Sequence, residues 1–72
     1  MNTTQRKTLQ NIGSNIRYYR KKKKLSQEDL AFECNLHRTY IGAVERGERN
    51  ITILNLILIM DALEIKFNQL YN

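Results

Sequence analysis

Residues 26–46 carry the start and stop signals of two short helices that lie only three residues apart. Ser26 is a good N-cap, and the acidic residue three positions later completes a capping box for a helix over residues 27–34. Asn35 ends this helix, because asparagine tolerates the left-handed conformation of a helix C-cap. A second helix is predicted over residues 38–46, before a glycine. Two short helices joined by so short a turn are typical of a helix-turn-helix.

Hydrophobic residues spaced three and four apart predict three further helices. The first covers about residues 8–23, and Gly13 weakens its start. Another follows the N-cap Thr52 over residues 53–63, and a short turn of helix around residues 67–71 closes the chain. The inward-facing side chains are predicted to be Leu9, Ile12, Ile16, Tyr19, Leu30, Ala31, Cys34, Leu36, Ile41, Val44, Ile53, Leu56, Ile59, Met60 and Leu63.

The composition favours one all-α domain over residues 1–72. Proline is absent, as expected of a chain made mostly of helices, because helix interiors exclude proline. Glycine occurs only three times, although the tight turns of β-hairpins need it. A chain this short buries only about 60% of the surface that its unfolded form exposes. Cys34 is the only cysteine and His37 the only histidine, so neither a disulfide nor a metal site can supplement the core. Self-association is therefore the expected supplement.

Positive charge is concentrated in the first part of the chain. Residues 1–50 hold 11 of the 12 lysines and arginines and 5 of the 7 acids. The remainder is nearly neutral, and residues 51–60 form its longest apolar stretch. This division predicts contact with a polyanion through the first part and a dimerisation region at about residues 52–72.

Several functional classes are excluded by what the chain lacks. One histidine, one cysteine and scattered carboxylates provide no nucleophile with a base and an orienting group, and no glycine-rich phosphate loop is present. The longest apolar stretch is far shorter than the roughly 20 residues of a membrane span, and the first residues do not read as a signal peptide. We therefore predict a soluble, cytoplasmic protein that is not an enzyme and needs no metal, cofactor or small-molecule ligand.

From residue 25 to residue 50 the chain reads LSQEDLAFECNLHRTYIGAVERGERN. This stretch resembles the XRE family of DNA-binding proteins, which share the helix-turn-helix of lambda repressor and Cro. Within that family, the segments SQEDLA, NL-x-RTYI, ER and RNITI are most similar to the controller proteins of restriction–modification systems. The resemblance extends over roughly residues 12–70. It implies a five-helix, lambda-repressor-like domain in which residues 38–46 form the recognition helix.

The resemblance also implies which side chains meet DNA. The major groove admits one helix, and only there do all four base pairs show different donors and acceptors. Arg38 would donate two hydrogen bonds to guanine, Thr39 would contact a base edge or a thymine methyl, and Ala43 would allow close approach to a thymine methyl. Contacts to the DNA backbone, which fix the register, are expected from Gln27, Tyr40, Arg46, Arg49 and Asn50.

The resemblance assigns a role to one further pair of residues, and the sequence departs from the family pattern at two positions, His37 and Gly42. Arg20 and Glu45 match residues that commonly form an ion pair between the first helix and the recognition helix, a pair expected to orient more than to stabilise. His37 stands where an Asp, Ser or Thr usually caps the recognition helix. Gly42 costs up to about 1 kcal/mol relative to alanine, and it serves either close approach to DNA or packing against a neighbouring helix.

The helix predicted over residues 53–63 is more apolar than one inward stripe requires. A helix that is apolar on all sides is buried on all sides, which in so short a chain implies a second copy. Two copies would place two recognition helices about one DNA turn apart, as a palindromic operator requires. The predicted dimer surface consists of Leu54, Ile57, Leu58, Phe67, Leu70 and Tyr71.

The resemblance implies a homodimeric transcriptional regulator that binds a palindrome in double-stranded DNA and contacts or blocks RNA polymerase. The promoter would control its own gene and a restriction endonuclease gene. A phage or plasmid repressor is the alternative within the same family. An antitoxin-type interaction protein that masks a partner is the alternative from another class, but it would need the residues after Asn50 that dimerisation already uses.

Overall fold

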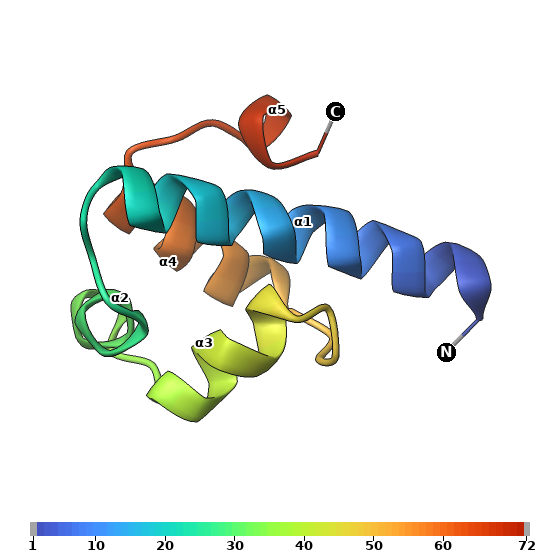
Figure 1. Cartoon of the computed structure of the whole chain (residues 1–72), viewed down its shortest axis with the longest axis horizontal. Coiled ribbons are helices and arrows are strands. Elements are labelled where there is room, and N and C mark those ends of the chain that lie inside the picture. Colours follow the sequence, from blue (N-terminus) through green and yellow to red (C-terminus); the bar gives the residue numbers. More distant parts are fainter. Residues whose placement is uncertain (1, 72) are drawn as a thin grey trace.

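The computed structural model describes residues 2–71 as five helices, with no strand in that range (Figure 1). In chain order they are α1 (Thr3–Lys22), α2 (Gln27–Cys34), α3 (Arg38–Glu45), α4 (Ile53–Leu63) and α5 (Phe67–Leu70). The predicted all-α, five-helix architecture is confirmed, and α2 to α5 lie within one residue of their predicted bounds. Within residues 2–71, none of the helices is long and apolar enough to cross a membrane.

The ends of the helix-turn-helix are formed by the residues that signalled them. The Ser26 side chain accepts a hydrogen bond from the Asp29 amide, and the Asp29 carboxylate accepts one from the Ser26 amide, so the capping box is complete. Asn35 ends α2 in the left-handed conformation, with φ 56°. His37 caps α3, because its Nδ1 accepts a hydrogen bond from the Thr39 amide at 3.2 Å. The turn between α2 and α3 is therefore fixed at both sides.

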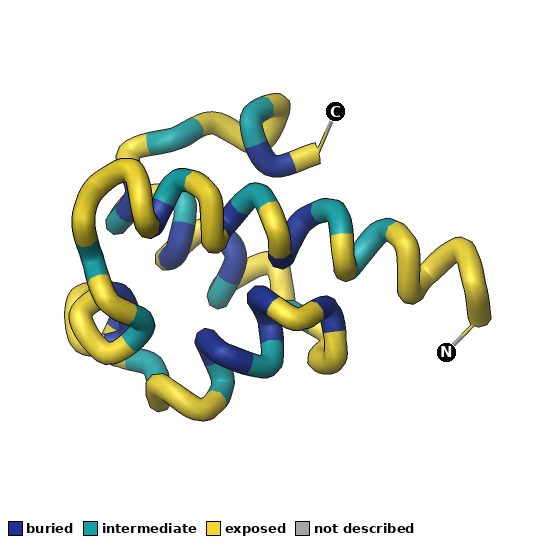
Figure 2. The backbone as a smooth tube through the Cα atoms, viewed as in Figure 1, coloured by how far each residue is buried: buried dark blue, intermediate teal, exposed yellow. Residues whose placement is uncertain are grey.

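The predicted start of α1 is wrong, because the helix begins five residues earlier, at Thr3. A second capping box causes this extension: Asn2 accepts from the Gln5 amide, and the Gln5 side chain accepts from the Asn2 amide. Figure 1 shows the extended end of α1 projecting beyond the other helices, and Figure 2 shows that it is largely exposed.

The core is enclosed by α1, α2, α3 and α4, and α5 packs on it against α1 (Figures 1 and 2). Two of the predicted inward-facing residues lie outside the core. Ile53 is 67% exposed, because it opens α4 one turn before Leu56, the first buried residue of that helix, and Leu9 is half-buried on α1 without joining the core cluster. The buried hydrophobic side chains are Ile12, Ile16, Leu30, Ala31, Cys34, Ile41, Val44, Leu56, Ile59, Leu63 and Leu70.

Leu70 corrects the predicted dimer surface, because its side chain is fully buried within one copy of the chain. After α4 the chain turns back, and α5 packs against α1. The Asn15 side chain donates a hydrogen bond of 2.7 Å to the Leu70 carbonyl, which holds this last turn against α1. Leu70 therefore stabilises the monomer and presents nothing to a second copy.

Candidate nucleic-acid interface

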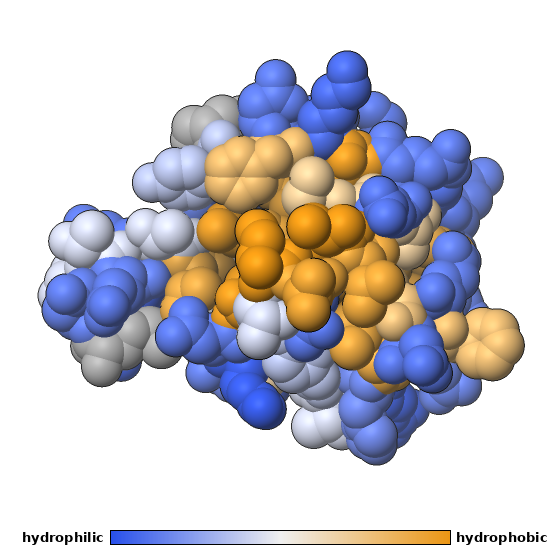
Figure 3. Space-filling view, turned by 180° about the vertical axis from the view of Figure 1, so that it is seen from behind, coloured by the Kyte–Doolittle hydropathy of each residue, from blue (hydrophilic) through white to orange (hydrophobic). Residues whose placement is uncertain are grey.

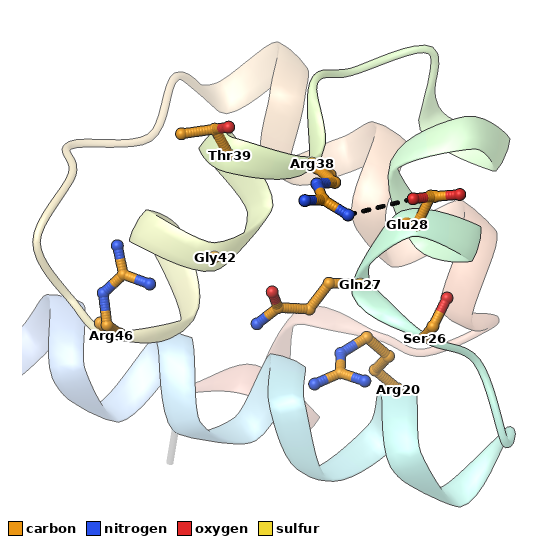
Figure 4. A pocket seen from close by; sticks show the side chains of 8 residues that line it. All are labelled: Arg20, Ser26, Gln27, Glu28, Arg38, Thr39, Gly42 and Arg46. Carbon is orange, nitrogen blue, oxygen red and sulfur yellow. Dashed lines mark hydrogen bonds and ion pairs between the residues drawn. The ribbon is translucent and has the colours of Figure 1, made fainter.

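A cleft of about 650 Å³ separates the exposed face of α3 from the start of α2 (Figure 4). It is open to solvent and carries more positive than negative charge. Arg38 and Thr39 lie at its α3 edge, both exposed, and the side chain of Arg46 lies at the far end of α3. The lining residues are Arg20, Ser26, Gln27, Glu28, Arg38, Thr39, Gly42 and Arg46.

Arg38 is the most prominent cation of this surface. Its Nη1 lies 3.2 Å from the Glu28 carboxylate, across the mouth of the cleft (Figure 4). Both side chains are about two-thirds exposed or more, at 67% and 73%. An ion pair this exposed stabilises the protein by at most about 1 kcal/mol. Glu28 therefore orients the Arg38 guanidinium but holds it only weakly. Arg38 is consequently free to exchange Glu28 for another acceptor.

The mid-helix glycine of α3 lies beside the ends of two polar side chains. A Cβ at Gly42 would lie 3.2 Å from Arg46 Nη1 and 3.3 Å from Gln27 Oε1. The side chains of Gln27, from α2, and of Arg46, the C-cap of α3, therefore flank Gly42 (Figure 4). Ala43, the next residue, is half-buried. The short distance to Gln27 supports packing against α2, while close approach to DNA stays a prediction, since Gly42 also lines the open cleft.

A buried polar network holds α3 in place beneath the cleft. Arg20 donates two hydrogen bonds to Glu45, from Nε at 2.6 Å and from Nη2 at 3.0 Å. Its Nη1 also donates to the Leu25 carbonyl, and Gln27 Nε2 donates to Glu45 Oε1 at 3.0 Å. The ion pair implied by the family resemblance is thus formed, and it joins α1, α2 and α3. Gln27 is already engaged in this network, which leaves only part of its amide for DNA.

Tyr40 is held from two directions on the other side of α3. The Arg49 guanidinium lies 5.2 Å from the centre of its ring, and Asn55 Nδ2 donates to its hydroxyl at 3.2 Å. Arg46 is paired with Glu48 at 2.9 Å, and both are exposed. Arg49 and Asn50 lie in the exposed turn between α3 and α4. The expected backbone-contacting residues therefore lie beside the body of α3 and around its C-terminal end.

The sequence did not identify Glu28 as the partner of Arg38 or Asn55 as the partner of Tyr40. The two members of these pairs lie 10 and 15 positions apart in the chain, and no local pattern connects them. Burial and the neighbouring Glu33 raise the pKa of the Cys34 thiol to about 11, so little of it is in the reactive thiolate form at neutral pH.

Known proteins share this arrangement. A family model described as "Helix-turn-helix" matches residues 16–70. Control protein C.SmaI of Serratia marcescens is 54% identical over 52 residues, which cover 72% of this chain and 62% of that protein. The match thus spans less than two thirds of that relative's length.

Two solved structures agree with this result. The restriction–modification controller protein C.AhdI from Aeromonas hydrophila is 43% identical, with a TM-score of 0.84 over 88% of this chain and 96% of that one. The C.Esp1396I controller tetramer, solved in complex with its natural 35 base-pair operator, is 44% identical, with a TM-score of 0.78 over 85% and 80%. The resemblance inferred from the sequence is confirmed: the chain belongs to the helix-turn-helix family and, within it, to the controller proteins of restriction–modification systems.

Proposed function

We propose that the chain regulates transcription by binding a palindromic operator as a homodimer, without catalysing a reaction. The observation that carries this proposal is the position of Arg38 and Thr39. Both are exposed at the start of α3, while the buried pair of Arg20 and Glu45 fixes the orientation of that helix. A recognition helix reads bases with its N-terminal residues, and these are the residues that α3 presents.

Base reading would proceed by exchange of partners. Arg38 would leave the exposed carboxylate of Glu28 and donate two hydrogen bonds to guanine O6 and N7, the most frequent specific contact in the major groove. Thr39 and Ala43 would meet base edges or thymine methyl groups from the same side of α3. The loss of the Arg38–Glu28 pair costs little because water already screens it.

The backbone contacts would lie on either side of α3. On one side, Gln27 stands at the start of α2, where free amides and the helix dipole favour a phosphate. On the other side lie the residues that follow α3, namely Arg46, Arg49 and Asn50. Tyr40 would face the DNA with the edge of its ring, which Arg49 and Asn55 leave uncovered. These contacts position the protein without reading sequence.

The dimer surface would be the apolar face on the far side of the molecule. Seen from behind, hydrophobic side chains gather there in one continuous area (Figure 3). Ile53 joins the residues predicted for it, since it lies one helical turn before Ile57. A patch of this kind on a small DNA-binding domain fits a second copy of the chain. Its exposed residues are Ile53, Leu54, Ile57, Leu58, Phe67 and Tyr71.

We expect Ile57→Glu to weaken the dimer at least tenfold, about 1.4 kcal/mol, because it places a charge within the apolar area. Sedimentation equilibrium over a concentration series measures this effect. Phe32→Glu is the matched control, because Phe32 is 85% exposed but lies on α2, outside that surface. Equal dissociation constants for the two variants would contradict the proposed dimer surface.

The genes controlled follow from the family. As a controller protein, the chain would regulate its own gene and that of a restriction endonuclease, acting on RNA polymerase at a nearby promoter. It would work in the cytoplasm, where a bacterial genome is accessible. Residues 1–72 would act as one helix-turn-helix domain, with residues 26–46 for DNA and residues 52–72 for dimerisation.

The test is selection of bound sequences from random double-stranded DNA at two salt concentrations. We expect enrichment of a palindrome whose half-sites are about one helical turn apart. Binding that disappears at moderate salt without an enriched motif would indicate a non-specific polyanion surface and would contradict the proposal.

A further inference from the structure

The N-terminal extension of α1 lies beside the end of the recognition helix. Gly47 ends α3 with φ 72°, and a Cβ there would lie 2.8 Å from both the Cα and the amide nitrogen of Gln10. The backbones of α1 and of this turn are therefore in direct contact at Gln10. Arg6 lies one helical turn earlier on the same face of α1, so its position relative to α3 is fixed as well.

A second cavity, of about 290 Å³, lies at this junction. It is lined by Arg6, Gln10, Arg46, Gly47 and Glu48. Arg46 also lines the cleft between α2 and α3, so the two hollows meet at its side chain. Positive charge thus continues from Arg38, past Arg46, to the extension of α1.

The charges of the cavity favour an anion. Arg46 donates from Nε to Glu48, and this pair is more than half exposed on both sides. Arg6 forms no ion pair with any acid among residues 2–71. One guanidinium therefore stands uncompensated beside a second that is only weakly held.

We propose that Arg6, Gln10 and Arg46 form a binding site for a DNA backbone phosphate just beyond the stretch covered by α3. This inference rests on the proposed function. A guanidinium donates two parallel hydrogen bonds to a phosphate, which a lysine does not. The side-chain amide of Gln10 would supply a further donor. The Glu48 carboxylate repels the phosphate and competes with it for the Arg46 guanidinium. Each copy of the dimer would add one such phosphate to its footprint.

The experiment measures operator and random-DNA affinity against salt concentration for the full chain and for Arg6→Gln. The slope of log K against log salt falls by about 0.9 for each phosphate that the protein no longer neutralises, so the slope of the dimeric variant should fall by about 1.8. Affinity for both DNAs should decrease by the same factor, because a phosphate contact carries no sequence information. Arg6 is exposed, and far-UV circular dichroism verifies that the variant folds.

Two further variants make the result decisive. Lys7→Gln removes an adjacent, exposed charge outside the cavity and should change the slope by less than half as much. Glu48→Gln should raise DNA affinity, because it removes the carboxylate that competes for Arg46. Equal slopes for Arg6→Gln and Lys7→Gln, or weaker binding by Glu48→Gln, would overturn the phosphate site. A wild type without operator preference would instead refute the proposed function itself.

Discussion

Arg38→Ala is expected to reduce operator preference strongly while leaving the protein folded. Removal of one bidentate interaction with guanine costs about 1–3 kcal/mol, and in a symmetric dimer the substitution removes it from both half-sites. The expected cost is therefore about 2–6 kcal/mol, a decrease in affinity of about 30-fold or more. Titration of labelled operator and of a scrambled duplex of the same length measures this, with the ratio of the two affinities as the readout.

The matched control for this variant is Arg38→Lys. Lysine keeps the positive charge but lacks the planar fork that matches two acceptors of guanine. We expect it to bind scrambled DNA as the wild type does and to lose most of the operator preference. Thermal stability should change little in either variant, because Arg38 pairs only with the exposed Glu28. An unchanged affinity ratio in Arg38→Ala would remove Arg38 from the base-reading surface.

Local signals explain why the helix-turn-helix could be predicted so closely. Capping hydrogen bonds join residues only three or four positions apart, so Ser26, Asn35 and Thr52 mark helix ends that can be predicted from the sequence. The same kind of signal marks the true start of α1 at Asn2 and Gln5. Periodicity gives that start no support, because the first hydrophobic residue within the helix, Leu9, comes nearly two turns later.

Features that depend on contact through space could not be predicted in this way. Leu70 and Tyr71 are neighbours near the chain end, yet only the first is buried, because Asn15 holds its carbonyl against α1. Arg38 and Glu28 meet only once α2 and α3 are packed. Sequence reasoning thus found which residues α3 presents but not what holds them before DNA binds.

Gly13 is the clearest case of a residue whose role depends on the fold, and it carries the second prediction. In an isolated helix, Gly→Ala stabilises by about 1 kcal/mol. Here a Cβ at Gly13 would lie 2.3 Å from the Val44 carbonyl oxygen and 2.7 Å from that of Glu45. Both neighbours are backbone atoms and cannot rotate away. We therefore expect the opposite sign, because α1 and α3 must separate by roughly 1 Å to reach an ordinary contact distance.

The separation would damage more than one interaction. It disrupts the packing where α1 crosses α3. It also lengthens the buried ion pair between Arg20 Nε and Glu45, which are 2.6 Å apart, and loss of this pair would leave buried charges without a partner. Overpacking of this kind lowers the free energy of unfolding by about 1–3 kcal/mol. We expect Gly13→Ala to lie at the upper end of this range, because the ion pair is weakened as well. For a domain of this size, a destabilisation of about 2–3 kcal/mol lowers Tm by about 10–20 °C.

Thermal unfolding at one fixed protein concentration measures the effect, since the proposed dimerisation would make Tm depend on concentration. Ser14→Ala is the matched control: it changes an exposed residue of the same helix, and alanine propensity should leave Tm equal or slightly higher. A stabilised Gly13→Ala would show that α1 can move away from α3 without cost. The orientation of the recognition helix would then depend on the Arg20–Glu45 pair and the buried side chains of α3, and not on the close backbone crossing that Gly13 permits.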